Sequence, residues 1–348
     1  MHQTLTQNRQ MTLAARPTGA PGAEHFALRT TPVPDIADGQ LLLRTVYLSL
    51  DPYMRGRMND ADSYAEPVAI GEVMVGGTIN RVVASRHPDY QAGDWVLSYS
   101  TGWQDYAVSD GTFLFKLDPS TAPVSHALGV LGMPGFTAYM GLLDIGKPKA
   151  GDTVVVAAAT GPVGSTVVQI AKRLGCRVVA IAGDEQKCRL ARDKFGADVA
   201  LNHKDTDLAA QLAQACPNGI DIYFENVGGK VLRAVLPLLN PNARIPLCGT
   251  VSSYNNSAPS AGPDHLDWAW STLLTKRVTV QGFIIFDDYG HRYGEFAEQM
   301  GQWVAEGKIQ YLEQIIDGLE NAPDALKGLL EGKNVGKLVI RVGPDELG

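Results

Sequence analysis

The feature that most constrains this chain is the stretch VVVAAATGPVGSTVVQIAKRLG, from Val154 to Gly175. A run of apolar residues leads into a turn that contains two glycines. The residues after the turn are apolar at the spacing of one helical face, namely Val167, Val168, Ile170, Ala171 and Leu174. A strand, a tight turn and a helix in this order form the first half of a βαβ unit, which requires a parallel sheet.

The same alternation of strands and helices continues along the chain beyond Gly151. Apolar runs, expected as strands, are TVVVAAA, RVVAIAG, DVALN, IDIYFENVG and ARIPLCG, and KRVTVQGFII (Lys276–Ile285) is expected as a sixth strand. A helix from Glu185 to Phe195 is expected between two of them, with Asp184 as its N-cap and Gly196 at its end. This order predicts an α/β fold with a doubly wound parallel sheet of the Rossmann type.

The first third of the chain has a different pattern. QLLLRTVYLSL (Gln40–Leu50), GGTINRVVAS and DWVLSYSTGWQDYAVSD are expected as short strands separated by turns, which is typical of a small β-barrel or partly open sheet. The C-terminal region predicts amphipathic helices at Tyr293–Glu306 and around Pro323–Leu330, followed by a last strand, GKLVIRV. We expect this last strand to rejoin the N-terminal β domain.

The turn after the first strand resembles the G-x-G-x-x-G fingerprint of dinucleotide-binding proteins, with Ala159 in place of the first glycine. Alanine there requires only that the turn avoid positive φ at that position. Gly161 would let the backbone approach a pyrophosphate, and Gly164 would let helix and strand pack closely. A glycine turn alone is a weak indication, but its place between strand and helix predicts a cofactor site that includes Thr160 and Val163.

The end of the second strand indicates which dinucleotide is bound. Gly183 stands where an acidic residue would hold the ribose of NAD, and Lys187 follows one turn later. Glycine leaves room for a 2′-phosphate, with which Lys187 could pair. Two alternatives remain: Lys187 as a solvated helix lysine, and Asp184 as an NAD ligand displaced by one position rather than a helix cap. The residues favour NADPH over NADH.

Composition and charge exclude several classes of partner. The chain has 348 residues, a formal net charge of −7 and 19% charged residues. This balance gives no reason to expect nucleic acid or an acidic membrane as a partner. No apolar run approaches the ~20 residues that a bilayer span needs. The N-terminal sequence MHQTLTQNRQMTLAARPTG is polar and resembles no export signal, so we expect a cytoplasmic protein.

The sequence lacks the residues for a zinc site, a disulfide framework or a hydrolase nucleophile. The four cysteines, Cys176, Cys188, Cys216 and Cys248, are widely spaced, and Cys176 and Cys248 are expected in the core. Glu72 has no neighbouring histidine, and the N-terminal region contains no cysteine, so we expect no metal. No G-x-S-x-G motif is present, which removes the α/β-hydrolase interpretation.

Seven separated motifs carry a resemblance to one family. They are SLDPYMRGR (Ser49–Arg57), GMPGFTAYMGL (Gly132–Leu142), AAATGPVGS, YFENVGG (Tyr223–Gly229), CGTVSSYN (Cys248–Asn255), EGKIQY (Glu306–Tyr311) and GKNVGKLV (Gly332–Val339). The chain resembles the zinc-free medium-chain dehydrogenase/reductase superfamily. Within it, the chain is similar to the leukotriene B4 12-hydroxydehydrogenase, prostaglandin reductase and curcumin reductase branch.

This resemblance implies a GroES-like catalytic domain, expected at residues 1–128 and 305–348, and an NADPH-binding Rossmann domain at 129–304. The active site would be the cleft between them. Members reduce the C=C bond of α,β-unsaturated ketones and aldehydes with NADPH, as oxidoreductases acting on CH–CH donors. The resemblance also implies a homodimer, in which KRVTVQGFII would pair across subunits.

The resemblance also implies roles for individual residues. Lys187 matches the lysine that meets the 2′-phosphate of NADPH, and Met133 matches the lining of the nicotinamide pocket. Phe283 and Ile284 match backbone partners of the nicotinamide amide. The remaining matched cofactor contacts are Asn226, Cys248, Tyr254 and Asn334. The chain departs from the family at His203, where close relatives have a tyrosine beside the phosphate, so a contact of His203 with the phosphate is an open question.

The expected chemistry is hydride addition to the β-carbon, stabilisation of the resulting enolate and protonation of the α-carbon. Tyr254 is the first candidate for the enolate contact, directly or through the ribose hydroxyl, and Tyr53 and Tyr64 are candidates on the substrate side. Arg55 and Arg57 could attract a carboxylated substrate, or they could be structural. The alternatives to an enone reductase are an NADPH:quinone oxidoreductase and a non-catalytic NADPH-binding protein.

Overall fold

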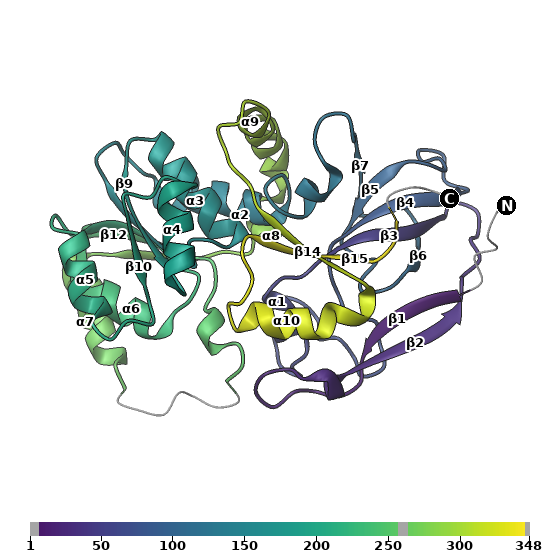
Figure 1. Ribbon diagram of the computed structural model, residues 1–348, viewed down its shortest axis with the longest axis horizontal. Helices are drawn as coiled ribbons and strands as arrows, with labels where there is room; N and C mark the ends of the chain where they lie inside the picture. Colours follow the sequence, from purple (N-terminus) through teal and green to yellow (C-terminus); the bar gives the residue numbers. More distant parts are fainter. Residues whose placement is uncertain (1–6, 257–263, 345–348) are drawn as a thin grey trace. The chain divides into compact units, whose positions relative to one another are not determined.

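The computed structural model describes residues 7–256 and 264–344, and the chain divides into two compact units (Figure 1). Unit 1 comprises Met1–Leu128, Asn255–Ser257 and Glu313–Gly348, and unit 2 comprises Gly129–Tyr254 and Ala258–Leu312. The first six residues of the polar N-terminal stretch lie outside the described residues.

The last boundary between the units falls after Leu312, whereas the sequence analysis placed it after residue 304. Two contacts explain the difference. Ile309 is buried in the core of unit 2. In addition, the Gln169 side chain pairs with the backbone of Gln310, with Nε2 donating to its carbonyl at 2.9 Å and Oε1 accepting from its N–H at 2.6 Å. The segment before Glu313 therefore belongs to unit 2.

Unit 2 is built on a six-stranded parallel sheet with the order β10-β9-β8-β11-β12-β13. This is the 3-2-1-4-5-6 order of the Rossmann fold, so the predicted fold class is confirmed for this unit. The strands are β8 (Thr153–Ala157), β9 (Arg177–Ala182), β10 (Val199–Asn202), β11 (Ile220–Phe224), β12 (Leu239–Leu247) and β13 (Thr279–Gly282).

The α-helices of this unit connect its strands or flank the sheet. They are α2 (Met133–Met140), which continues as a π-helix over Gly141–Gly146, α3 (Pro162–Arg173), α4 (Glu185–Asp193), α5 (Leu208–Ala215), α6 (Gly229–Val235), α7 (Leu266–Lys276), α8 (Ile285–Tyr289) and α9 (Tyr293–Ala305). Asp184 caps α4 as expected, since its carboxylate accepts the N–H of Lys187.

Two expectations for unit 2 are corrected by the structure, and one helix comes in addition to those expected. Leu174 ends α3 and is 38% exposed, because it lies beyond the last turn that faces the sheet. The expected sixth strand is shorter than KRVTVQGFII, since its first residue ends α7 and its last begins α8. Helix α7 itself was not expected from the sequence.

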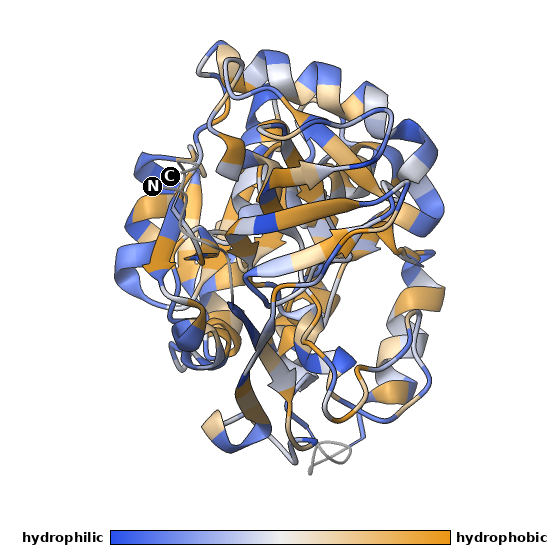
Figure 2. Cartoon of the chain, turned by 90° about the vertical axis from the view of Figure 1, so that its right-hand side faces the viewer, coloured by the Kyte–Doolittle hydropathy of each residue, from blue (hydrophilic) through white to orange (hydrophobic). Residues whose placement is uncertain are grey.

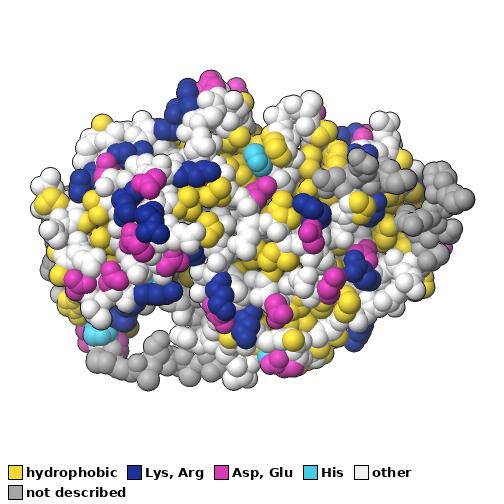
Figure 3. Space-filling view, viewed as in Figure 1, with side chains coloured by type: hydrophobic (Ala, Val, Ile, Leu, Met, Phe, Trp, Pro, Cys, Tyr) yellow, Lys and Arg dark blue, Asp and Glu magenta, His cyan; other side chains and the backbone are white. Residues whose placement is uncertain are grey.

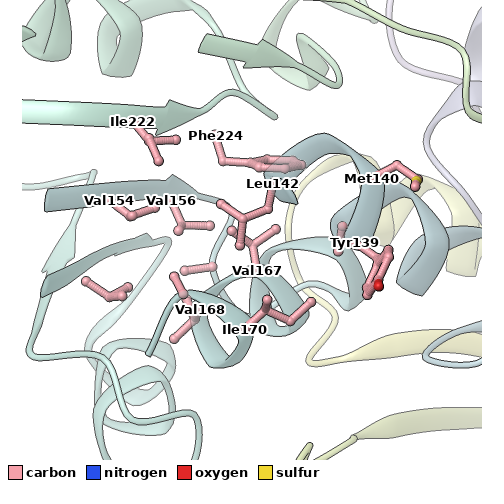
Figure 4. Packing of buried hydrophobic residues seen from close by; sticks show 14 of the residues in the cluster. Tyr139, Met140, Leu142, Val154, Val156, Val167, Val168, Ile170, Ile222 and Phe224 are labelled. Atoms are coloured by element: carbon pink, nitrogen blue, oxygen red, sulfur yellow. The ribbon is translucent and has the colours of Figure 1, made fainter. Parts of the chain in front are cut away.

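The apolar face of α3 packs against the sheet, as Figure 4 shows. Val167, Val168 and Ile170 of the helix are completely buried among strand residues Val154, Val156, Ile222 and Phe224 and the side chains of Tyr139, Met140 and Leu142. This packing fixes the start of α3, which follows the glycine turn, relative to the strand ends.

Unit 1 contains a seven-stranded sheet and a separate two-stranded sheet. The first has the order β14-β15-β3-β4-β5-β7, with β6 also paired to β3. Its strands are β3 (Leu41–Ser49), β4 (Thr78–Ser85), β5 (Trp95–Ser98), β6 (Tyr106–Ser109), β7 (Leu114–Leu117), β14 (Glu313–Asp317) and β15 (Lys337–Arg341). The second joins β1 (Gln7–Leu13) to β2 (Phe26–Pro32). Helices α1 (Tyr53–Arg57) and α10 (Ala322–Leu330) belong to the same unit. In Figure 2 orange, the apolar colour, is concentrated on strands in the middle of the view, and blue is frequent on the helices and loops around them.

A C-terminal strand pairs with an N-terminal one inside unit 1. Strand β15 pairs antiparallel with β3, with Val339 opposite Ser49. At this junction the Lys337 ammonium lies 2.8 Å from an Asp51 carboxylate oxygen and also donates to the Leu50 carbonyl at 2.7 Å. Lys337 is fully buried, and Ser49 donates to the other Asp51 oxygen. A buried ion pair therefore holds the end of β3 just before α1.

Removing one partner of this pair should destabilise unit 1 strongly. Asp51→Ala leaves a buried, unpaired Lys337, so we expect the free energy of unfolding to fall by about 3–5 kcal/mol in urea denaturation. The control is Asp317→Ala, which breaks a solvent-exposed pair between Asp317 of β14 and Arg341, a residue of the strand that carries Lys337. That loss should stay below about 1 kcal/mol. Equal losses in the two variants would contradict the structural role of the buried pair.

Candidate functional site

Residues predicted to hold the cofactor follow each of the six strands of unit 2. The glycine turn follows β8, Gly183 follows β9, His203 follows β10, Asn226 follows β11, Cys248 follows β12, and Phe283 with Ile284 follows β13. Because the strands are parallel, these positions share the carboxyl edge of one sheet, where open α/β folds bind ligands. Met133 lies elsewhere, at the start of α2.

The glycine turn fits a dinucleotide pyrophosphate. Gly161 is the N-cap of α3 and has no side chain that could accept a hydrogen bond from the first N–H groups of the helix. Such N–H groups at a helix start can bind a phosphate. A Cβ on Gly164 would lie 2.4 Å from the Ala158 carbonyl oxygen, so only glycine allows the observed approach of helix and strand. The left-handed residue is Ala158, with φ of 52°, and not Ala159. The turn also contains Thr160, which is buried, and Val163.

Asn226 connects two strands at the point where the strand order reverses. Its Nδ2 donates to the Ala157 carbonyl, at the end of β8, at 2.8 Å. Strands β8 and β11 are neighbours in the sheet, and the connections leave in opposite directions on the two sides of this pair. This switch point is the usual crevice for a dinucleotide.

The loop that carries Asn226 is held by a residue that the sequence analysis did not single out. One oxygen of Glu225 accepts the Tyr223 hydroxyl at 2.9 Å and the N–H groups of Val227 and Gly228 at 2.6 and 2.8 Å. Burial raises the pKa of Glu225. A carboxylic residue directly after an apolar strand and before a Gly-Gly pair is the sequence signal that could have identified it.

At the end of β9, the structure separates the two alternatives for Asp184. Its carboxylate accepts the Lys187 N–H at 2.8 Å, so Asp184 caps α4. The Lys187 side chain is 7% exposed, and burial lowers its pKa. A buried lysine at this position is not an ordinary solvated helix lysine, and its charge fits a phosphate.

The strand ends of β12 and β13 carry less polar groups. Burial raises the pKa of the Cys248 thiol to about 12, so this sulfur stays protonated and unreactive. Cys248 is only partly buried, unlike Cys176, which lies in the core as predicted. Phe283 is buried against Tyr289. The N–H of Ile284 donates to the Asp288 carboxylate at 2.8 Å, so that group is already occupied.

Tyr254 follows the loop after β12. Its backbone N–H donates to the Val251 carbonyl at 3.3 Å. A Cβ on Gly249 would lie 2.9 Å from the Tyr254 hydroxyl, so the absence of a side chain there makes room for the tyrosine.

The candidate residues of unit 1 lie around α1 and near β15. Tyr53 begins α1, and burial, together with the Asp51 carboxylate, raises its pKa well above the usual value. Tyr64 is 53% exposed. The Asn334 amide donates to the Gly336 carbonyl at 2.9 Å and lines a cavity of about 320 Å³ with Gln314, Asn321, Asp324 and others.

Arg55 and Arg57 are structural in this arrangement. The buried Arg55 guanidinium donates to the Gly19 carbonyl at 2.9 Å and to Asn59 at 2.6 Å. Arg57 donates to the Glu66 carbonyl at 2.6 Å. The two arginines therefore hold the connection between β1 and β2 and the segment after α1, rather than offering a free cation to a substrate.

Within residues 7–256 and 264–344, no group of three or more His, Cys, Asp or Glu side chains is placed to hold a metal ion. Among the helices of that same part of the chain, none has the length and apolar character needed to cross a bilayer.

Family models match both parts of the chain. Residues 9–117 match the N-terminal domain of oxidoreductase, and residues 162–306 match the zinc-binding dehydrogenase family. The chain belongs to the medium-chain dehydrogenase/reductase superfamily, in the branch of the curcumin and prostaglandin reductases.

Individual relatives are similar over nearly their whole length. The chain is 63% identical to the NADPH-dependent curcumin reductase of Escherichia coli K12, over 99% of this chain and 100% of the relative. It is 42% identical to the NADP(+)-dependent 2-alkenal reductase of Nicotiana tabacum, over 96% and 97%. The crystal structure of CurA from Vibrio vulnificus in complex with NADPH is similar with a TM-score of 0.94 and 63% identity, over 97% and 99% of the two chains.

Proposed function

We propose that this protein is an NADPH-dependent reductase of the C=C bond of α,β-unsaturated ketones and aldehydes. The observation that carries the proposal is the carboxyl edge of the unit 2 sheet, where an uncapped helix start and a buried lysine beside Gly183 fit the phosphates of NADPH. The 63% identity to a reductase named for NADPH and curcumin, a dienone, supports the same cofactor and substrate class.

Binding of the cofactor is assigned to named residues. The start of α3, with Thr160, Gly161, Val163 and Gly164, would hold the pyrophosphate, and Lys187 the 2′-phosphate. Asn226 stands at the switch point, where its amide is already oriented by the Ala157 carbonyl. The remaining proposed contacts are Met133, Cys248, Tyr254, Phe283, Ile284 and Asn334.

Bound NADPH supplies the hydride that adds to the β-carbon of the substrate. Negative charge then develops on the carbonyl oxygen, and the protein must donate a hydrogen bond to it. Tyr53 suits this role because its raised pKa keeps the hydroxyl protonated across the physiological range. Tyr254 and Tyr64 are the further candidates for contact with the substrate or the ribose.

Adding an enone to the purified protein should accelerate NADPH oxidation and yield the saturated carbonyl compound. We expect turnover with a 2-alkenal and with a linear dienone, measured by loss of absorbance at the nicotinamide band and by product identification. Turnover confined to quinones would replace this proposal with a quinone reductase. Tight NADPH binding without turnover of either class would leave a non-catalytic NADPH-binding protein.

Replacing Tyr53 by phenylalanine should lower kcat about 10²-fold and leave the KM for NADPH unchanged, because a donor to the developing oxyanion is lost. In the parent enzyme, kcat should show no loss of the Tyr53 proton near the ordinary tyrosine pKa of 10.0, since burial raises it. Tyr90→Phe is the matched control, because the Tyr90 hydroxyl donates to the Leu114 carbonyl in another part of unit 1. An unchanged kcat in Tyr53→Phe would remove Tyr53 from the mechanism.

We further propose a cytoplasmic homodimer. In the described sheet, β13 is one of the two edge strands, and α7, which packs on the neighbouring β12, exposes Trp270 and Leu274 by 63% and 77%. An exposed edge and large apolar side chains are typical of a subunit interface. Light scattering should give twice the chain mass of 37.3 kDa, and cell fractionation should recover the protein with the cytoplasm. A monomeric mass would contradict the dimer.

A further inference from the structure

The charges of three lysines act on His203 at the ends of β9 and β10, namely those of Lys230, Lys204 and Lys187. They come from separate elements: Lys187 from α4, Lys204 from the turn after β10 and Lys230 from the start of α6. Figure 3 shows Lys and Arg side chains, with acidic ones among them, over the face that carries α4 and β10.

The position of the His203 ring is fixed by the backbone on which it lies. The His203 N–H donates to the Ala182 carbonyl at 2.9 Å, which extends the pairing of β10 with β9 by one residue. A Cβ on Gly183 would lie 3.4 Å from His203 Nε2, so the ring stands directly over the glycine. A ligand group held over Gly183 would therefore meet an imidazole nitrogen.

Lys230 is placed by the loop that Glu225 holds. Gly228 and Gly229 both have positive φ, of 75° and 57°, and Lys230 comes next, on the first turn of α6. Because Glu225 accepts the Gly228 N–H, the turn before Lys230 is fixed from within the core. The Lys230 side chain is exposed, so its ammonium can reach a ligand without leaving a buried site.

We infer that Lys230 and His203 complete, with Lys187, the site for the 2′-phosphate of the cofactor, and that His203 takes up a proton from solvent when this phosphate binds. The inference rests on the proposed function, since it assumes NADPH as the ligand. It assigns to Lys230 a part in the choice between NADPH and NADH, and to His203 a role that a tyrosine cannot fill.

The charges around the ring support the proton uptake. Burial, then Lys230, Lys204 and Lys187, lower the pKa of His203, so the ring is neutral at pH 7 in the free protein. A phosphate monoester carries a charge of about −1.5 to −2 at pH 7 and favours the protonated ring. The charged residues of the neighbouring elements are Asp184, Glu185, Lys187, Arg189, Arg192 and Asp193 at or in α4, Lys204, Asp205 and Asp207 after β10, and Lys230 and Arg233 of α6.

The nearest carboxylates are already engaged. Asp184 caps α4, and Asp205 accepts the Asn202 amide at 3.0 Å.

The direction in which pH changes the phosphate affinity follows from the protonation of the His203 ring. Its contribution to phosphate affinity is complete below the pKa of the free ring and is lost as the pH rises through the higher pKa of the bound ring.

Calorimetry with two cofactor fragments tests Lys230. 2′,5′-ADP contains the 2′-phosphate and 5′-AMP lacks it, so the ratio of their affinities isolates that group. We expect Lys230→Ala to weaken the binding of 2′,5′-ADP five- to tenfold and to leave the affinity for 5′-AMP unchanged. Lys230→Arg should retain the ratio of the two affinities. Lys187→Ala is the positive control and should weaken the binding of 2′,5′-ADP by a larger factor. Lys194→Ala removes an exposed lysine at the other end of α4 and should change neither affinity.

Nuclear magnetic resonance of the His203 ring tests the proton. The pKa of the ring should rise by at least one pH unit when 2′,5′-ADP saturates the protein, and by less than about 0.3 with 5′-AMP. His203→Phe keeps an aromatic ring over Gly183 and should abolish the proton uptake seen when calorimetry is repeated in buffers of different ionisation enthalpy.

The outcomes separate this inference from the proposed function. If 2′,5′-ADP binds in preference to 5′-AMP but Lys230→Ala leaves the ratio unchanged, or the ring pKa is the same with both ligands, the inference is wrong and NADPH dependence stands. If the parent protein binds neither fragment and no NADPH, both the inference and the proposed function are overturned.

Discussion

The ion pair between Asp51 and Lys337 is the contact on which the arrangement of unit 1 depends. It joins residues 286 positions apart in the chain. It also satisfies a lysine that is fully enclosed and fixes the strand end that leads into α1. Tyr53 follows two residues later, so the proposed donor to the substrate is positioned by a contact with the last strand of the chain. The carboxylate that holds Lys337 also contributes to the raised pKa of Tyr53.

In unit 2, acidic side chains likewise fix the backbone. They hold the loops after the strands in place, so that polar groups lie in fixed positions at one edge of the sheet. Glu225 does this for the loop after β11, by accepting two backbone N–H groups, and Asp184 does it for α4. The two acidic side chains hold backbone groups in place, and Lys187 and Lys230 are the basic side chains proposed to meet a ligand.

The sequence predicted what depends on local pattern. Strands β8 to β12, the helix after the glycine turn and the Asp184 cap follow from apolar periodicity and from capping chemistry, which neighbouring residues determine. Helix α7 was missed because its apolar residues, such as Trp270 and Leu274, are exposed and give no buried stripe. Leu174 was assigned to the core because periodicity does not show where a helix ends.

Contacts between distant residues could not be predicted in this way. The Asp51 and Lys337 pair, the clamp of Gln169 on Gln310 and the approach of Lys230 to His203 each join segments that the fold brings together. The resemblance to a family supplied Lys187, Asn226 and the tyrosines as candidates, but it gave no role to Glu225 or Lys230. Glu225 became visible through its burial and its hydrogen bonds, and Lys230 through its electrostatic effect on His203.

The pairing of β15 with β3 also sets an order on the synthesis of the protein. At the usual rate of about 5–20 residues per second, the ribosome needs roughly 15–60 s to travel the 286 positions from Asp51 to Lys337. During that time the whole of unit 2 is translated, while the edge of β3 that β15 will cover is open and Asp51 is still in water. Unit 1 is therefore the first unit whose synthesis begins and the last to be completed.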